Sequence, residues 1–360
     1  MNFFKSLLSK KSSKEIKNEE NESKALKDKE VKESNLDNHQ DEEQIYFTSE
    51  ATEANQVRNI EVSMYNANNI GKSQTGNSLI LFKSPEYDID FFAVLNPHGL
   101  SGKEISSFLI VFIQNYIAEN VKKIAKMSKD SEIEEFLVTM ISKANQELLN
   151  NGIDLNFSGT TLTCLLILKN TVYVSWIGNS KAIMFRKISE EKKYAIELTV
   201  DHVPDNREER YRIFENGGIV QRISVKNKEQ GPLRVWEGRI ENGPGLHITR
   251  SLGDTKSKKL GVISDPEVQH IKLKNWDKFI VLGTENVWSL IYSTQMSYYV
   301  NKFLTKSPDQ FQTIAKSIIK KMNSMWSKIS DISEVINKVD VTTFDPNDSC
   351  LIIIKLTDDV

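Results

Sequence analysis

The stretch FFAVLNPHGLSG, residues 91–102, has the form of a strand that ends at a functional site. A run of apolar residues leads into Asn96 and Pro97, and His98 and Gly99 follow. A histidine at such a turn can act as a general acid or base, because its pKa lies near neutrality. Asn96 can do neither, because an amide does not ionise. The turn is therefore typical of a catalytic site, although the residue that the strand delivers to it is chemically neutral.

Strand-like and helical patterns fill the chain from about residue 57 onward. The strand-like runs are NSLILF, DFFAVLN, TTLTCLLILK, TVYVSWIG, KAIMFRK, KFIVLGT and CLIIIKL. Apolar residues at helical spacing predict helices over 102–125, 131–149, 207–216 and 308–329. The strands cluster as hairpins, one of them turning at Lys169 and Asn170, and the helices come in pairs. This order predicts an α+β fold with helices packed on sheets, and not a regular alternation of strand and helix.

The first part of the chain differs in composition from the rest. Residues 1–56 consist mainly of Lys, Glu, Asn, Asp and Ser, a composition that cannot bury enough apolar surface to fold. Within it, MNFFKSLLSKKSSK places apolar residues at helical spacing among lysines, which suits an anionic membrane surface or a groove on a partner. An unstructured lysine-rich leader is the alternative. We therefore predict a disordered, charged segment over 1–56 and one domain over 57–360.

Composition narrows the range of partners and compartments. A net charge of −2 and a pI of about 6.3 give no overall basic field, so we expect no nucleic-acid partner. Cys164 and Cys350 lie inside apolar runs, which predicts buried free thiols and a reducing, intracellular compartment. No apolar run approaches the roughly 20 residues that cross a membrane. We expect a cytoplasmic protein, with any membrane contact being peripheral and made through residues 1–14.

A series of motifs lies in order along residues 60–358. They are FFAVLNPHGLSG, SGTTLTCLLI, VYVSWIGNSKAIM, ELTVDHVPDNREERYRIFENGG, RVW, PGLHITRSLGD, GVISDPEV, FIVLGTENVW and NDSCLIIIKL. In this order they resemble the PP2C-type (PPM) metal-dependent serine/threonine protein phosphatases. The resemblance implies a β-sandwich of two antiparallel sheets flanked by pairs of helices. It also implies a binuclear Mg²⁺ or Mn²⁺ centre, held by carboxylates, whose bridging water attacks the phosphate in line.

The chain departs from this family at the positions that carry its chemistry. Amide or hydroxyl side chains stand there in place of the phosphate-binding arginine (Ser73), a glutamate (Asn77) and four aspartates (Ser78, Asn96, Asn179 and Asn347). Glu285 keeps a carboxylate where the family has an aspartate, and Asp348 lies one place beyond Asn347. The scaffold glycines and core residues of the motifs are present. The pattern therefore indicates a site that was neutralised on an inherited scaffold.

Electrostatics decides what such a site can hold. Two dications about 4 Å apart repel by roughly 16 kcal/mol at an effective dielectric of about 20, and active members offset this with several carboxylates. Glu285 and Asp348 are weak metal candidates, so we expect no cofactor, with a single weakly held cation at Glu285 as the alternative. His98 occupies the position of the family's general acid, but without a metal-bound nucleophile we expect it to hold the turn by hydrogen bonding. Asp254, present in the family pattern, is expected to form a turn or a helix cap.

These observations predict a catalytically inactive PP2C-like pseudophosphatase that acts as a binding or regulatory adaptor in phosphorylation signalling. Its expected partner is a protein of the kinase or phosphoprotein class. The alternative is a divergent metal-dependent serine/threonine phosphatase that binds Mg²⁺ or Mn²⁺ through Glu285, Asp348 and neutral oxygens. A module that only senses phosphopeptides is disfavoured by the loss of the arginine at Ser73. The charged segment Ile219–Gly243, which resembles the family's flap, is either a solvated face or a partner surface.

Overall fold

The computed structural model describes residues 60–67, 76–189, 191–225, 228–238, 245–306, 308–336 and 349–356. The predicted disordered segment over 1–56 lies outside the described residues, as do Ser73, Asn347 and Asp348. In the part of the chain that is described, no helix is both long enough and apolar enough to cross a membrane.

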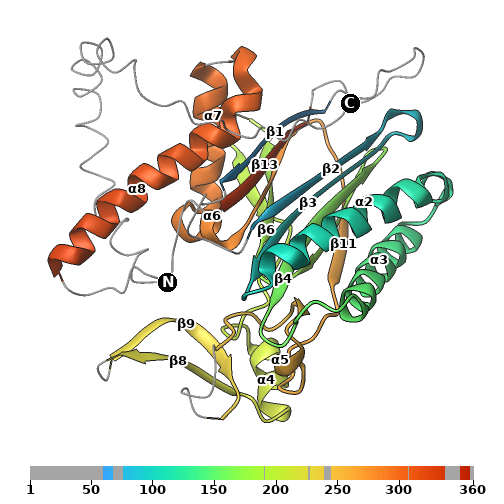
Figure 1. Cartoon of the computed structure of the whole chain (residues 1–360). Helices are drawn as coiled ribbons and strands as arrows, with labels where there is room; N and C mark the ends of the chain where they lie inside the picture. The colour runs from blue at the N-terminus through green and yellow to red at the C-terminus, as the bar shows by residue number, and fades with distance from the viewer. Residues whose placement is uncertain are drawn as a thin grey trace, which may run out of the picture. The chain divides into compact units, whose positions relative to one another are not determined.

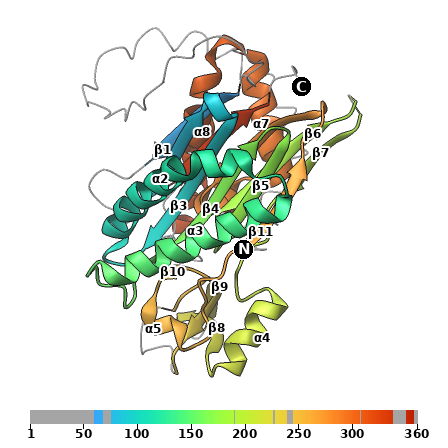
Figure 2. The same ribbon diagram turned by 90° about the vertical axis from the view of Figure 1, so that its right-hand side faces the viewer.

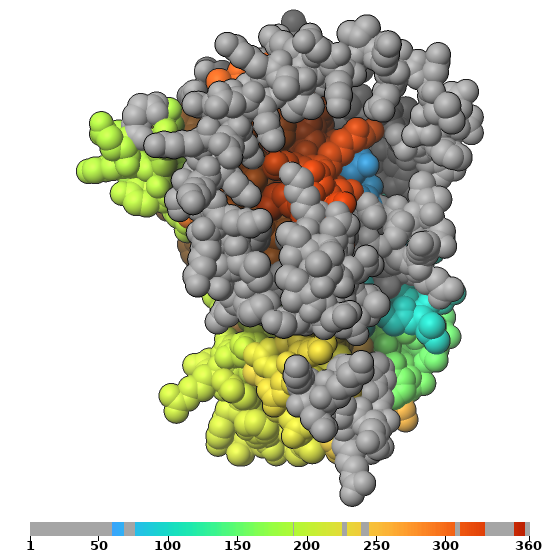
Figure 3. Space-filling model, turned by 90° about the vertical axis from the view of Figure 1, so that its left-hand side faces the viewer, coloured from blue at the N-terminus to red at the C-terminus, as the bar shows by residue number. Residues whose placement is uncertain are grey.

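Two antiparallel sheets form the centre of the domain (Figure 1). The five-stranded sheet has the order β1 (Glu61–Ala67), β13 (Ser349–Lys355), β12 (Asp277–Gly283), β6 (Lys181–Lys187) and β7 (Lys193–Glu197). The six-stranded sheet has the order β11 (Glu267–Lys272), β5 (Thr171–Ile177), β4 (Gly159–Leu168), β3 (Ile89–His98) and β2 (Ser78–Ser84), and β10 (Leu252–Gly253) pairs with β4. The predicted turn at Lys169 and Asn170 is confirmed, because Leu168 pairs with Thr171. The hairpin that joins β6 and β7 projects from the surface (Figure 3).

Helices cover the outer faces of both sheets. Helices α2 (Gly102–Lys126) and α3 (Asp130–Asn150) lie on the six-stranded sheet (Figure 2). Helices α6 (Glu285–Leu290), α7 (Ser293–Lys306) and α8 (Ile314–Ile336) lie on the five-stranded sheet, together with the 3₁₀ turn η3 (Pro308–Thr313). The helix predicted over 308–329 is divided between η3 and α8, and the chain also bends within η3 at Gln310, whose backbone angles are not helical. The predicted α+β sandwich with flanking pairs of helices is confirmed.

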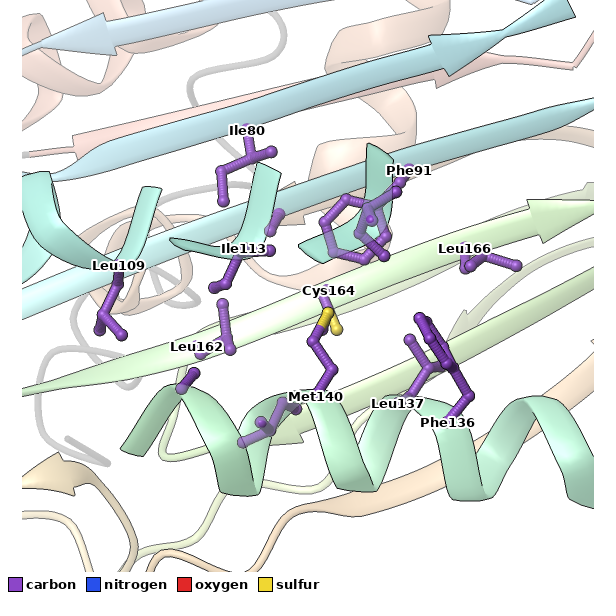
Figure 4. Packing of buried hydrophobic residues seen from close by; sticks show 14 of the residues in the cluster. Ile80, Phe91, Leu109, Ile113, Phe136, Leu137, Met140, Leu162, Cys164 and Leu166 are labelled. Atoms are coloured by element: carbon purple, nitrogen blue, oxygen red, sulfur yellow. The ribbon is translucent and has the colours of Figure 1, made fainter. Parts of the chain in front are cut away.

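Strand β4 is buried along its whole length, because each of its faces meets a different hydrophobic core. Cys164 and Leu166 pack against the helices, beside Ile113 of α2 and Met140 of α3 (Figure 4). Leu165 and Ile167 point to the opposite face and pack between the two sheets. Alternation of side chains along a strand therefore explains why the run TTLTCLLIL shows no polar periodicity.

A smaller group of elements lies in the chain between β7 and β11. It contains α4 (Arg207–Glu215), α5 (Thr255–Lys258) and the two-stranded ribbon of β8 (Ile219–Val225) and β9 (Lys228–Trp236). Ile213 of α4 and Val235 of β9 share a small core with Ile248 and Val262. The remaining short element, η1 (Pro85–Tyr87), joins β2 to β3.

Candidate functional site

The turn at the end of β3 lies beside the start of β4. Asn96 pairs with Thr161 and His98 pairs with Gly159. Gly99 follows with a φ of +80°, and a Cβ atom at this position would lie 2.4 Å from the carbonyl oxygen of Phe157. Only glycine fits such a position without strain. The glycine after the histidine is thus required by the backbone and does not depend on any catalytic role.

His98 is fixed by a buried carboxylate. Its Nε2 atom lies 2.9 and 2.8 Å from the two carboxylate oxygens of Asp254. A Cβ at position 159 would lie 2.2 Å from Asp254 Oδ2, so Gly159 makes room for this approach. Burial by itself lowers the pKa of His98, but the charge and hydrogen bond of Asp254 outweigh it and raise that pKa. The expected turn at Asp254 is confirmed, since the N–H of Ser257 donates to its carbonyl oxygen at 2.9 Å. The expected side-chain cap is wrong: the Asp254 carboxylate makes no cap hydrogen bond to α5 and binds His98 instead.

Glu285 begins helix α6 directly after β12, and a histidine already holds its carboxylate. The Oε2 atom of Glu285 lies 2.6 Å from Nε2 of His247, and both side chains are 24% exposed. Burial favours the neutral acid, but His247, a hydrogen bond from Asn179 and the charge of Arg234 outweigh it and lower the pKa of Glu285. The carboxylate is therefore ionised and paired within the protein itself.

Packing around Gly178 brings Asn179 to this carboxylate. Gly178 has a φ of +92°, and a Cβ there would lie 2.5 Å from Cγ2 of Thr161. Because Thr161 is also the β4 partner of Asn96, this contact places the turn carrying Asn179 against the end of β3. Asn96, Asn179 and Glu285 are thus brought to one end of the sandwich.

Asn77 and Ser78 reach the same end from the start of β2. Ser78 pairs with Leu95, the residue before Asn96, and both Asn77 and Ser78 are buried. The backbone carbonyl of Asn77 accepts a hydrogen bond of 2.8 Å from Asn66 Nδ2. Strand β13 also begins here, since the N–H of Cys350 donates to Thr284 Oγ1 at 3.0 Å.

This donor set does not fit a binuclear centre of Mg²⁺ or Mn²⁺. Over the residues that the structure describes, no three His, Cys, Asp or Glu side chains are placed to hold one metal ion together. Of the described positions that match family ligands, Asn77, Ser78, Asn96 and Asn179 are neutral, and Glu285 alone carries a carboxylate. Hard dications require several carboxylate oxygens, and the one available here is paired with His247.

Sequence reasoning missed His247 and Arg234. His247 lies between two apolar residues in PGLHITRSLGD, and Arg234 lies in the segment treated as a solvated or partner-binding flap. Arg234 is in fact half-buried and donates to the carbonyl oxygen of Gly245 at 2.6 Å. The available signal was that both residues fall inside motif stretches, but nothing in their spacing linked them to Glu285.

Fold and site together define an α+β sandwich whose polar site lies where strands of both sheets end. The family model "Protein phosphatase 2C" matches residues 50–328, and the chain belongs to this family. The rice protein "Probable protein phosphatase 2C 12" is 33% identical over 193 residues, which are 52% of this chain and 47% of the rice protein. The chain thus spans about half of that relative's length. "Probable protein phosphatase 2C 3" of Paramecium tetraurelia is 29% identical over 245 residues, covering 64% of this chain and 74% of that protein.

Two solved structures share the fold. The serine-threonine phosphatase 2C of Toxoplasma gondii superposes with a TM-score of 0.63 at 16% identity, covering 83% of this chain and 95% of that one. A sex determining protein of C. elegans superposes with a TM-score of 0.64 at 19% identity, covering 82% of this chain and 64% of that one. At these identities the likeness concerns the fold alone.

Proposed function

We propose that this member of the PP2C family is a pseudophosphatase that acts by binding another protein in phosphorylation signalling. The observation that carries the proposal is the pairing of Glu285 with His247. In a metal-dependent phosphatase a carboxylate at this position would face a dication, and here it faces an imidazole 2.6 Å away. A metal ion would have to displace His247 and would then find neutral amides at Asn96 and Asn179.

Loss of charge at the other positions supports the same conclusion. Asparagine can offer a carbonyl oxygen to a cation, but it cannot offset the repulsion between two dications. His98 retains a partner in Asp254, so its hydrogen bonds are satisfied without a reaction to assist. The alternative function is a divergent phosphatase that uses Glu285, Asp348 and Mg²⁺ or Mn²⁺.

Phosphatase assays of the purified full chain separate these two functions. With millimolar Mn²⁺ or Mg²⁺, hydrolysis of a phosphopeptide and of an aryl phosphate should not exceed the background rate, and calorimetry should detect no stoichiometric Mn²⁺ binding. The matched control is the Glu285→Ala variant, which should behave as the parent does. Metal-dependent turnover that disappears in Glu285→Ala would establish the enzyme and overturn the proposal.

The partner surface that we favour is an open groove between α4 and the β8–β9 ribbon. It encloses about 830 Å³ and is lined by Tyr211, Phe214, Val220, Leu233, one acid, Glu208, and two arginines, Arg207 and Arg210. Tyr211 and Phe214 are exposed. Neither arginine forms an ion pair with another described residue. Exposed aromatic rings beside cations suit a segment that combines an apolar anchor with negative charge.

Peptide binding tests this surface. A synthetic acidic peptide with one aromatic residue, in phosphorylated and unphosphorylated forms, should bind the parent and lose affinity in Phe214→Ala. Tyr298 on α7 is also exposed, and Tyr298→Ala serves as the matched control. Equal binding by all three proteins would place the partner surface elsewhere.

A further inference from the structure

Three loops meet at the end of the sandwich opposite the candidate site. Strand β3 ends at the site with His98 and begins at Ile89, which pairs with Leu168 beside the β4–β5 turn. The other two loops are the β6–β7 hairpin and the loop between β11 and β12. Figure 2 shows the ends of β6 and β7 at the far end of the sheets from β10 and the ribbon.

Backbone hydrogen bonds join these loops into one surface. The N–H of Lys187, at the end of β6, donates to the carbonyl oxygen of Trp276 at 2.7 Å. The N–H of Leu273 donates to the carbonyl oxygen of Asn170 at 2.8 Å. The loop over 273–276 is therefore held between the β4–β5 turn on one side and the β6–β7 hairpin on the other.

Lysine dominates the charge of this surface. We define the basic tip as the three loops with the lysines that they carry, which are Lys169, Lys187, Lys192, Lys193, Lys272, Lys274 and Lys278. The acids nearby are fewer: the sequence of the hairpin carries Glu190 and Glu191, and Glu86 and Asp88 lie in or next to η1. Asp277 adds no free negative charge, because it is buried and accepts from Arg186 at 2.6 Å. Since the whole chain has a net charge of −2, this concentration of cations is local.

Large apolar side chains are exposed among these lysines. Ile188 is 52% exposed, Tyr194 is 47% exposed and Trp276 is 40% exposed. Trp276 stands on a rigid base, because its carbonyl accepts from Lys187 and the next residue, Asp277, is fixed by Arg186. Tryptophan and tyrosine favour the boundary between lipid and water, and lysines beside them attract anionic headgroups.

We infer that the basic tip docks this domain onto an anionic membrane surface, with Trp276 and Tyr194 at the headgroup level and the lysines against acidic lipids. The inference goes beyond the proposed function, because the basic tip lies at the opposite end of the strands from the candidate site. A membrane accounts for the exposed Ile188, which has no role in recognising a hydrated polyanion such as nucleic acid. Docking in this way leaves the groove beside α4 open to a protein partner.

Vesicle sedimentation of the full chain tests the inference. The parent should pellet with vesicles of phosphatidylcholine and phosphatidylserine, not with phosphatidylcholine alone, and added salt should weaken the binding. In Lys192→Glu/Lys274→Glu the affinity should fall by at least about tenfold. The matched control is Lys103→Glu/Lys256→Glu, two exposed lysines on the first turn of α2 and on α5 at the site end of the sandwich, which changes the net charge equally and should alter the affinity less than about twofold.

Tryptophan fluorescence gives a second measurement. Anionic vesicles should shift the emission of the parent to shorter wavelength, and Trp276→Phe should remove the shift, because Trp176, Trp236 and Trp288 are buried and Trp326 packs against the core under α8. Unchanged sedimentation of Lys192→Glu/Lys274→Glu would overturn the inference and assign any vesicle binding to another segment, such as residues 1–14. Binding to heparin or an oligonucleotide in preference to vesicles, with no shift in emission, would overturn it in favour of a soluble polyanion.

Discussion

Replacing His247 by alanine tests the charge balance of the candidate site most directly. Glu285 would lose its closest partner, the imidazole nitrogen 2.6 Å away, and would keep the hydrogen bond from Asn179 and the more distant charge of Arg234. A hydrogen bond to a charged group contributes about 1.5–3 kcal/mol. Because both side chains are 24% exposed, water replaces part of this interaction. We therefore expect His247→Ala to lower the free energy of unfolding by about 1–2 kcal/mol.

Thermal and urea denaturation of the full chain measure this loss, which corresponds to a fall in Tm of roughly 2–8 °C. Adding Glu285→Gln to His247→Ala should recover much of the stability, because the unpaired charge is then removed. Millimolar Mn²⁺ should stabilise His247→Ala, whose carboxylate no longer faces the imidazole, and should leave the parent unchanged. If Mn²⁺ stabilises the parent as much as the variant, His247 does not block a cation, and the argument for an inactive site fails.

Three further predictions concern the restored site, acid stability and the turn after His98. The first restores the family's acids in one combined variant, Asn77→Glu, Ser78→Asp, Asn96→Asp, Glu285→Asp and Asn347→Asp. Without metal this variant should be less stable than the parent, because its carboxylates repel one another, and Mn²⁺ should reverse the loss. Calorimetry measures the Mn²⁺ binding, and Tm measures the change in stability. If the variant folds and shows neither effect, the site has changed in shape as well as in charge. Glu209 is buried, which opposes ionisation, but Arg212, Arg250 and Thr249 lower its pKa from 4.5 to about 2. Since the unfolded chain takes up this proton first, stability should fall as the pH drops from 4.5 toward 2, and urea denaturation should show a shallower fall in Glu209→Gln. Gly99→Ala should lower the free energy of unfolding by about 2 kcal/mol or more. Gly217 has a similar φ but open space around it, so Gly217→Ala should lower the free energy of unfolding by only about 1 kcal/mol. Equal losses in Tm would contradict the predicted clash at Gly99.

The main strands and the first two helices could be predicted because burial dictates their residue patterns. Strand β3 and the pair of α2 and α3 follow directly from apolar runs and helical spacing. Edge strands gave no such signal. Strand β7 (KYAIE) and strand β11 (EVQHIK) are half exposed at the edges of their sheets, and their identity depends on partners far along the chain.

The candidate site was predictable in its positions and not in its interactions. Neutral residues at Asn77, Ser78, Asn96 and Asn179 could be recognised from the motifs, and the structure brings them together at one end of the sandwich. The partner of Glu285 could not be recognised, because His247 is 38 residues away and reaches it only through the packing of loops. For the same reason, the motif around Glu209 gave no sign that Arg250 fixes this carboxylate inside the protein at 2.7 Å.

The complete burial of β4 has a consequence for how the domain opens. Cys164 and Leu166 belong to one core, and Leu165 and Ile167 belong to the other, so neither core can be lost without exposing residues of the same strand. Helices α2 and α3 should therefore not detach as an independent unit while the two sheets stay together. Amide hydrogen exchange along β4 is then expected to require global unfolding, with the slowest rates in this strand and faster exchange in the solvent-facing turns of α2.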